Sequence, residues 1–355
     1  MVLHVEVRKT RDIKRASDGI PYIRRGAQKL PVSTDQALRR LQLNKGLTSF
    51  ETETVAASVD SIANSAPIIQ FILDIVPIAE PELWLRKQQL VLGDKPTVAG
   101  VLLFAEEPQA LLPKRCAIKI YRYKTKDRTG SRETLDFDPI TVEGHSYVQI
   151  DTAVSQTTEI IEDIDVLGEK ITYPNVTLHE IITNAVLHRD YSIADDVHVR
   201  IFDNRIEVQS PGTLPAHVTV KNILDERYAR NGNLVRLINK FPNPPNKDVG
   251  EGLNTAFDAM RKLRLKDPQI TQGESSVTVF IRHESLSSPE EMVRQYLDTN
   301  SSINNSRARE LCYINSENRM KRVFERLIQQ GLIERIPGRK GRAIAYQKRQ
   351  SAPSS

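Results

Sequence analysis

The spacing of apolar and polar residues predicts which segments of the chain form helices and which form strands. Residues 45–86 have the period of helices, whereas residues 97–105 form a nearly continuous apolar run of strand length. Residues 116–123 alternate as a partly exposed strand, and residues 147–167 have the period of a long amphipathic helix. The first half of the chain is therefore expected to mix helices and strands.

A second α/β unit is predicted to begin near Tyr173. It combines strands of alternating pattern with a helix that is apolar over most of its surface, so both kinds of element are expected to share one core. The predicted elements are a buried helix at 177–187, strands at 197–202 and 205–208, a loop at 210–212, a helix at 252–263 and a strand at 277–281.

The C-terminal part has a different pattern, in which helices come first and strands last. Three helices followed by a hairpin is the order of a winged helix-turn-helix domain, whose third helix reads the major groove of DNA. The predicted elements are a helix at 289–300 capped by Ser288, a short helix at 306–313, a third helix at 315–330 and a hairpin at 332–346.

Positive charge is concentrated in this C-terminal part. The whole chain has a formal net charge of +5, whereas residues 307–349 contain twelve basic and four acidic residues, a net charge of +8. Such a segment predicts a polyanionic partner, here double-stranded DNA, although a solvated helical tail or a protein-interaction module can have the same composition. The residues expected to contact DNA are Arg319, Arg322 and Arg326 on the third helix and Arg339, Lys340 and Arg342 at the hairpin tip.

Length and composition limit the class of protein. The 355 residues are enough for two or three domains, each with its own core. No apolar run approaches the roughly 20 residues that a membrane helix needs, and the N-terminus has no apolar segment of signal-peptide type. The two cysteines, Cys116 and Cys312, exclude a zinc site built from a cysteine cluster and argue against a disulfide framework. A cytoplasmic protein without a membrane partner is therefore expected.

The most informative segment for chemistry is the predicted helix at 177–187 and the residues that follow it. Glu180, Asn184 and His188 are spaced four apart, so they form a stripe on one face of a largely apolar helix. An amide oxygen on Asn184 is suited to Mg²⁺, and a carboxylate on Glu180 is suited to orient or deprotonate water. A structural network of hydrogen bonds is the alternative, because buried polar side chains need partners.

This segment resembles the N-box helix of the GHKL ATPase superfamily, which includes histidine kinases, gyrase-type topoisomerases and MutL. Residues 173–282 are more closely similar to the ATPase-like C-terminal module of RecG-like predicted transcriptional regulators, because four blocks occur in the same order. These blocks are NAVLHRDYS, IFDNRIEVQSPGTLP, ARNGNLVRLI and DVGEGLNTAFDAM. The resemblance implies a GHKL-like α/β sandwich with ATP and Mg²⁺ as its cofactors.

Residue by residue, the resemblance implies that Asn184 binds Mg²⁺ and that Glu180 is the catalytic residue that activates water. Ser210 lies near the position where the family has an aspartate that reads adenine, so ATP binding is a stronger expectation than hydrolysis. The sequence has no GxxxxGK[ST] P-loop and no helicase motor motifs, so it does not predict a helicase. Six residues are expected to contact the nucleotide. Asn184 and His188 come from the predicted helix and its end, Ser210 and Gly212 from a first glycine box, and Gly250 and Gly252 from a second.

The N-terminal residues show a shorter resemblance. GIPYIRRG at 19–26 is similar to the end of a Schlafen/AlbA-type domain, and a strand predicted at 2–7 fits that reading. The rest of such a domain is absent, so we expect either a truncated chain or a separate polypeptide that supplies the missing half. Arg24 and Arg25 are candidates for phosphate contacts or are solvated surface charges. Residues 84–109 resemble the linker domain of the same regulators.

These patterns together predict an α/β (α+β) chain: a GHKL-like sandwich, preceded by a linker α/β domain and followed by a winged helix-turn-helix. The expected function is that of a DNA-binding transcriptional regulator with an ATP-binding sensor domain. Assembly into an oligomer is compatible with this expectation. The alternatives are an ATP-dependent enzyme that acts on DNA, with weak ATPase activity, and an interaction adaptor whose nucleotide site is vestigial. The expected domains are 1–44 (Schlafen/AlbA-type remnant), 45–172 (linker), 173–284 (ATP-binding), 285–349 (winged helix) and 350–355 (tail).

Overall fold

The chain divides into two compact units, which are described separately. Residues 1–259 and 267–283 form the first unit, and residues 260–266 and 284–355 form the second. The computed structural model describes residues 9–166, 169–170, 173–215, 217–226, 228–245, 252–263, 265–282, 288–312, 314, 316–338 and 344–349. The strand expected at residues 2–7 lies outside these ranges.

The first described elements are a hairpin and a helix. Strands β1 (Tyr22–Arg25) and β2 (Gln28–Pro31) pair antiparallel. Helix α1 (Asp35–Lys45) was not predicted, although its local signals are clear. Thr34 caps its first turn by accepting from the Ala37 N–H, and Gly46 ends it with a φ of 65°, in the left-handed region that favours glycine.

Short helices occupy the region up to residue 111. They do not form the more continuous helical run that residues 45–86 suggested, because new helices begin at Ala66 and at Pro81, each with a proline in its first turn. A cluster of aromatic rings, Phe71, Trp84 and Phe104, packs in this region against Phe241. The elements are η1 (Phe50–Thr52), α2 (Asp60–Ala63), α3 (Ala66–Ile75), α4 (Pro81–Lys87), the hairpin β3 (Val91–Leu92) and β4 (Lys95–Pro96), α5 (Val98–Phe104) and α6 (Pro108–Leu111).

The strand predicted at residues 97–105 is wrong, because these residues form helix α5. The Thr97 side chain accepts a hydrogen bond from the Gly100 N–H and so begins the helix. Every residue of α5 is buried, so the segment has no polar face. A helix that is buried on all sides shows no period of its own, and a short apolar run then looks like a buried strand.

A six-stranded mixed sheet forms the centre of the first unit. Its order is β11-β12-β10-β9-β5-β6, and all neighbouring strands are antiparallel except β5 and β9. Ser210 and Pro211 belong to β10 rather than to the expected loop, because the strand continues in register against β12. Strand β11 was not predicted. The strands are β5 (Ile118–Arg122), β6 (Ile140–Val142), β9 (Val197–Ile201), β10 (Arg205–Pro211), β11 (Gln269–Gln272) and β12 (Ser276–Arg282).

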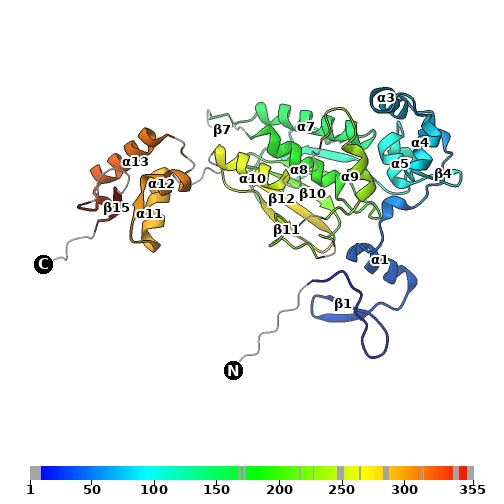
Figure 1. Ribbon diagram of the computed structural model, residues 1–355, viewed down its shortest axis with the longest axis horizontal. Coiled ribbons are helices and arrows are strands. Elements are labelled where there is room, and N and C mark those ends of the chain that lie inside the picture. Colours follow the sequence, from blue (N-terminus) through cyan, green and yellow to red (C-terminus); the bar gives the residue numbers. More distant parts are fainter. Residues whose placement is uncertain are drawn as a thin grey trace. The chain divides into compact units, whose positions relative to one another are not determined.

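Helices α7 (Ser146–Glu162) and α8 (Asn175–Leu187) lie side by side on one face of this sheet (Figure 1). Apolar residues on that face, such as Ile120, Val199 and Val208, are completely or almost completely buried. The sheet and its helix layer extend across the domain boundary expected at residues 172 and 173, since β5, β6 and α7 precede it. Helix α7 ends at Glu162, five residues earlier than the predicted helix. The remaining elements are η2 (Arg132–Thr134), β7 (Asp165–Val166), β8 (Glu169–Lys170), α9 (Gly232–Ile238) and α10 (Gly252–Lys262).

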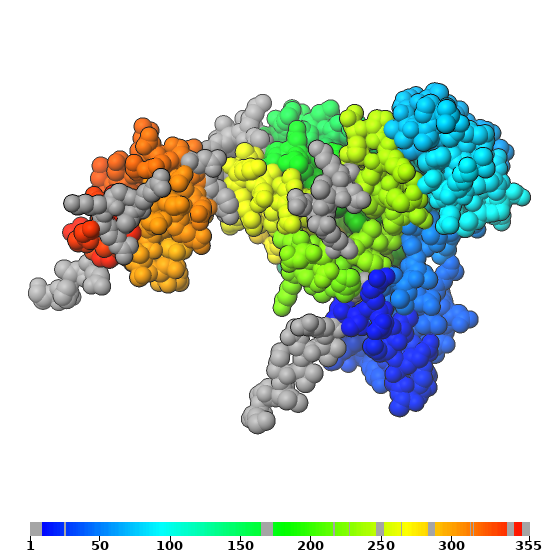
Figure 2. Space-filling model, in the orientation of Figure 1, coloured from blue at the N-terminus to red at the C-terminus, as the bar shows by residue number. Residues whose placement is uncertain are grey.

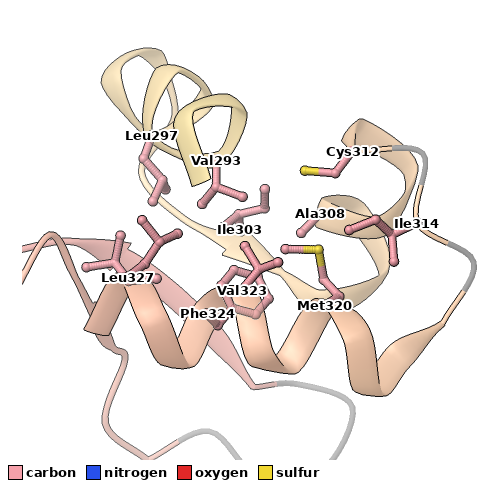
Figure 3. Packing of buried hydrophobic residues seen from close by; sticks show 11 residues of the cluster. Val293, Leu297, Ile303, Ala308, Cys312, Ile314, Met320, Val323, Phe324 and Leu327 are labelled. Carbon is pink, nitrogen blue, oxygen red and sulfur yellow. The ribbon is translucent and has the colours of Figure 1, made fainter. Parts of the chain in front are cut away.

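The second unit has its own hydrophobic core. Eleven buried residues, including Val293, Met320 and Phe324, pack together inside it (Figure 3). The three predicted helices are confirmed with small shifts of their ends, and Ser288 forms a capping box with Glu291. The elements are α11 (Pro289–Thr299), β13 (Ile303–Asn304), α12 (Asn305–Leu311), α13 (Glu317–Gln329), β14 (Ile333–Arg335) and β15 (Ala345–Lys348).

The strands of the second unit form a three-stranded sheet in the order β13-β15-β14. The predicted hairpin is present as the β14 and β15 pair, in which Ile333 lies opposite Lys348. Strand β13 was not predicted, because two residues between helices give no periodic signal. The expected tip residues Arg339, Lys340 and Arg342 lie outside the described residues.

No helix among the described residues is long and apolar enough to cross a membrane. Cys116 and Cys312 are both buried and form no disulfide.

Candidate functional site

A cavity of about 450 Å³ lies between α8 and the end of the sheet formed by β10, β11 and β12. Its volume is in the range of small-molecule and cofactor sites. Strand residues Val208, Val277 and Val279 provide an apolar wall, and the segment between β10 and α9 provides a second one. Polar side chains line the cavity from several elements, and three of them, Glu180, Asn184 and His188, form the row of residues four apart on α8 and its C-terminal cap.

The first polar feature is a pair of side chains one helical turn apart on α8. The Asn184 Nδ2 donates a hydrogen bond to Glu180 Oε1 at 2.7 Å, and both residues line the cavity. Burial raises the pKa of the Glu180 carboxyl, and the hydrogen bond from Asn184 lowers it in part. This bond uses the amide nitrogen of Asn184, and its Oδ1 is an oxygen of the kind that a hard cation prefers.

His188 extends the same row by one further turn, at the C-terminal cap of α8. Burial inside the unit lowers the pKa of its imidazole to about 4, and the positive charge of Arg230 acts in the same direction. His188 is therefore uncharged near neutral pH. From Glu180 to His188 the helix rises by about 12 Å, at 1.5 Å for each step along the chain.

Two glycines allow close approaches at the cavity. A Cβ on Gly252, at the start of α10, would stand 1.9 Å from Glu180 Oε1, so only glycine fits beneath this carboxylate in its present position. Gly212 has a φ of +107°, and a Cβ there would stand 2.6 Å from the Cβ of Asp190. Ser210, beside it, donates from Oγ to the Ala185 carbonyl at 2.8 Å and so connects β10 to α8.

The fold therefore brings most of the expected nucleotide residues to one cavity. Glu180, Asn184, His188, Ser210, Gly212 and Gly252 all line it. Gly250 lies outside the described residues. Among the described residues, no group of three His, Cys, Asp or Glu side chains could hold a metal ion. A cation at Asn184 would therefore take its other oxygen ligands from water or from phosphates, as Mg²⁺ commonly does.

Sequence reasoning missed a buried ionic cluster next to the cavity. Asp190 Oδ2 lies 3.2 Å from Arg40 Nη1 and 3.3 Å from Arg230 Nη1, and its own side chain is only 2% exposed. Arg230 also donates to the Thr213 carbonyl, and Asn231 donates to the carbonyls of Leu187 and Arg189. The sequence around these residues, HRDYS and ARNGN, is itself polar, so nothing there distinguishes them from surface charges.

The second candidate surface is the outer face of α13. Arg319, Arg322 and Arg326 are exposed and lie within an arc of about 60° at 3.6 residues per turn. The opposite side of the helix is buried through Met320, Phe324 and other core residues. The structure separates Arg326 from the other two, because its guanidinium pairs with Glu290 of α11 at 2.6 Å.

Comparison with known proteins agrees with part of this description. Residues 194–281 match a family model described as "Putative ATP-dependent DNA helicase recG C-terminal". An ATPase-like domain related to the RecG C-terminus is thus present, which is compatible with ATP binding and supports a RecG-like relationship at a coarse level. The match includes Ser210, Gly212 and Gly252, whereas α8 precedes it.

A similar fold occurs in a solved structure, the DIP2311 protein from Corynebacterium diphtheriae. The TM-score is 0.52 at 14% sequence identity, and the alignment covers 94% of this chain and 76% of that one. At this identity the likeness concerns the fold alone. No curated protein matches the chain in sequence.

Proposed function

We propose that the first unit binds a nucleoside triphosphate with Mg²⁺ in the cavity, and that the second unit is a winged helix that binds duplex DNA. The observation that carries the first half is the row Glu180, Asn184 and His188 inside a cavity of suitable size. The chain is then a DNA-binding regulator with a nucleotide sensor in cytoplasmic surroundings.

The nucleotide half of the proposal assigns a GHKL-like sandwich, with one layer of helices over one mixed sheet. In this assignment the triphosphate lies near Glu180, Asn184 and the N-terminus of α10, where backbone N–H groups favour anions. The base lies further along the row toward His188, among apolar side chains of the sheet and the neighbouring wall. The Asn184 Oδ1 fits a hard cation such as Mg²⁺ that also holds phosphate oxygens, and the Glu180 carboxylate is suited to orient a water molecule beside it.

The DNA half rests on topology and charge. The order α11, β13, α12, α13, β14, β15, with a sheet arranged β13-β15-β14, supports a winged helix. Its third helix exposes Arg319 and Arg322, for which no partner occurs among the described residues, near its N-terminal end. Side chains at the N-terminal end of a recognition helix contact base edges in the major groove.

One experiment on the purified full chain tests the nucleotide half. Labelled ATP is titrated with Mg²⁺ into the wild type, into Asn184→Ala and into Asn64→Ala, a control on an exposed residue remote from the cavity. We expect saturable binding by the wild type and the control, and binding about tenfold weaker by Asn184→Ala, through the loss of contacts to charged groups. Absence of wild-type binding at millimolar ATP would make the cavity structural and leave the adaptor alternative.

A further inference from the structure

The N-terminal segment forms hydrogen bonds to one wall of the cavity. We call described residues 213–230, between β10 and α9, the cavity loop, because Leu214, Val218 and Tyr228 in it line the cavity. The N-terminal segment is residues 9–52. Figure 2 shows the blue N-terminal part of the chain against the light green part that contains the cavity loop.

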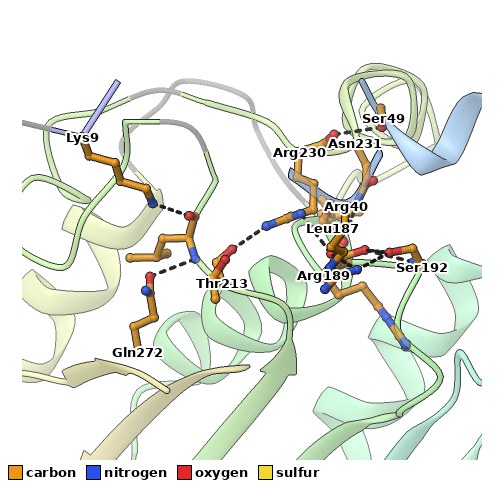
Figure 4. Close-up of polar contacts among 12 residues, drawn as sticks. Lys9, Arg40, Ser49, Leu187, Arg189, Ser192, Thr213, Arg230, Asn231 and Gln272 are labelled. Carbon is orange, nitrogen blue, oxygen red and sulfur yellow. Dashed lines mark hydrogen bonds and ion pairs between the residues drawn. The ribbon is translucent and has the colours of Figure 1, made fainter. Parts of the chain in front are cut away.

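Hydrogen bonds join the two segments at both ends of the loop. Near its start, Lys9 Nζ donates to the Leu214 carbonyl at 2.6 Å (Figure 4). It also donates to the Val218 carbonyl at 3.0 Å. Near its end, the Ser49 Oγ donates to the Arg230 carbonyl at 3.0 Å. The N-terminal segment therefore donates to the carbonyls of Leu214 and Val218, whose side chains line the cavity. It also donates to the carbonyl of Arg230, which follows the lining residue Ala229.

Tyr228 makes a further contact between the two segments. Its hydroxyl donates to the Gly46 carbonyl at 2.9 Å, and a Cβ on Gly46 would stand 1.9 Å from that hydroxyl oxygen. The Arg11 guanidinium lies 5.3 Å from the centre of the Tyr228 ring. The glycine that ends α1 thus also creates the space into which a cavity-lining side chain fits.

A chain of polar contacts runs from α1 to the first residue of the cavity loop. Arg40 of α1 contacts Asp190 Oδ2 and donates to the Ser192 Oγ at 2.7 Å. The same Asp190 oxygen contacts Arg230, which donates to the Thr213 carbonyl (Figure 4). Asp190 and Arg230 are almost completely buried, whereas the Arg40 side chain is 40% exposed. Arg40 is therefore the accessible end of a buried junction.

Two more contacts extend the junction to the helix after the loop. Glu51 accepts from the backbone N–H groups of Asn233 and Leu234, both at 2.8 Å, and so caps α9. The cavity loop is consequently anchored at its start, at its end and at the following helix by one continuous N-terminal segment. A loop that is ordered before binding loses less conformational entropy when it closes on a ligand.

We propose that the N-terminal segment is a positioning element of the nucleotide site, coupled to nucleotide binding through the Arg40, Asp190 and Arg230 junction. This inference rests on the proposed nucleotide function. Mg·ATP binds more tightly when the segment holds the cavity loop, and bound Mg·ATP in turn holds the segment in place. The two effects are equal in size, because a coupling free energy between two sites is reciprocal.

The first test measures Mg·ATP affinity in full-length variants of neighbouring arginines. Arg40→Gln removes the charge at the junction, Arg40→Lys keeps it, and Arg39→Gln is the matched control, since Arg39 pairs with Glu53 at the surface. We expect binding about tenfold weaker in Arg40→Gln, within the usual range of coupling between sites. Binding should be largely restored in Arg40→Lys and unchanged in Arg39→Gln. Equal affinities in Arg40→Gln and the wild type would overturn the coupling.

The second test uses the wild type alone, so that it does not depend on how any variant folds. Trypsin cleavage within the N-terminal segment, at exposed sites such as Lys14 and Arg24, is followed by mass spectrometry with and without Mg·ATP. We expect cleavage there to slow severalfold with Mg·ATP, while cleavage in the second unit stays constant. Nucleotide binding without this protection overturns the inference and leaves the proposed function standing. If the wild type binds no nucleotide, both fail.

Discussion

Gly252 lies directly against the Glu180 carboxylate, where an added Cβ would stand 1.9 Å from Oε1 and 2.3 Å from Cδ. Gly252→Ala must therefore displace the Glu180 side chain and disturb its hydrogen bond with Asn184. Gly232, at the start of α9, is the control, because a Cβ there meets nothing within 4 Å.

In an ordinary helix, replacing glycine by alanine stabilises by up to about 1 kcal/mol. We expect Gly232→Ala to melt at or above the wild-type temperature, whereas Gly252→Ala melts lower and binds Mg·ATP more weakly. Thermal melting and nucleotide titration on the three proteins measure both effects. Identical melting temperatures and Mg·ATP affinities in the two variants would mean that the contact between Gly252 and Glu180 affects neither stability nor binding.

Glu180→Gln separates binding from turnover. The glutamine keeps the size of the side chain and an oxygen that can accept from Asn184, but it cannot take a proton from water. If the cavity hydrolyses ATP, we expect unchanged nucleotide affinity and turnover reduced by about 10²–10⁴-fold, the usual effect of losing a general base. Phosphate release and labelled-nucleotide titration are measured side by side. Equal turnover would remove Glu180 from the catalytic role, and no turnover in the wild type would leave a binding-only sensor.

Glu51 predicts a pH dependence of stability. Burial raises the pKa of its carboxyl, and the N–H groups of Asn233 and Leu234 oppose that shift only in part. With a folded-state pKa above the unfolded one, the contribution of this group to stability is fully present below the unfolded pKa of about 4.3 and falls as pH rises through the folded pKa.

The comparison needs Glu51→Gln, which does not titrate, and the exposed control Glu107→Gln. We expect the unfolding free energy of the wild type, relative to Glu51→Gln, to decrease as the pH rises above the unfolded pKa of about 4.3. Urea unfolding at several pH values measures this difference. The same slope relative to Glu107→Gln would assign the effect to another group.

The local part of the candidate site could be predicted from the sequence. Glu180, Asn184 and His188 reach one cavity because the helical period alone places residues four apart on one face. The helices of the second unit were predicted from the helical period together with local chemistry, since the Ser288 side chain marks the start of the first one.

Contacts between distant segments left no local signal. Arg40 and Asp190 are separated by 150 residues, and nothing near either one indicates the other. The burial of α5 on all sides removed the period that would have identified it as a helix. Arg326 matched the spacing of Arg319 and Arg322 on α13, but its pairing with Glu290 depends on how α11 packs. Periodicity assigns a residue to a face, and tertiary packing decides what that face contacts.

The pairing of Arg326 leads to the last prediction, which concerns DNA. Residues 288–348 contain a complete hydrophobic core, so this fragment should fold alone and bind duplex DNA. Arg319→Ala and Arg322→Ala should each cost about 1–3 kcal/mol on a preferred sequence and relax sequence preference, as expected for lost base contacts. Arg326→Ala should instead lower the melting temperature slightly, because an exposed ion pair contributes about 0–1 kcal/mol.

Replacing Arg339, Lys340 and Arg342 together should weaken binding on any sequence and flatten the salt dependence by about two to three units. Fluorescence anisotropy at several salt concentrations, on selected and random duplexes, distinguishes these patterns. If the fragment folds but binds no duplex at low salt, the second unit is a protein-interaction module, because its fold and charge would then serve a partner other than DNA.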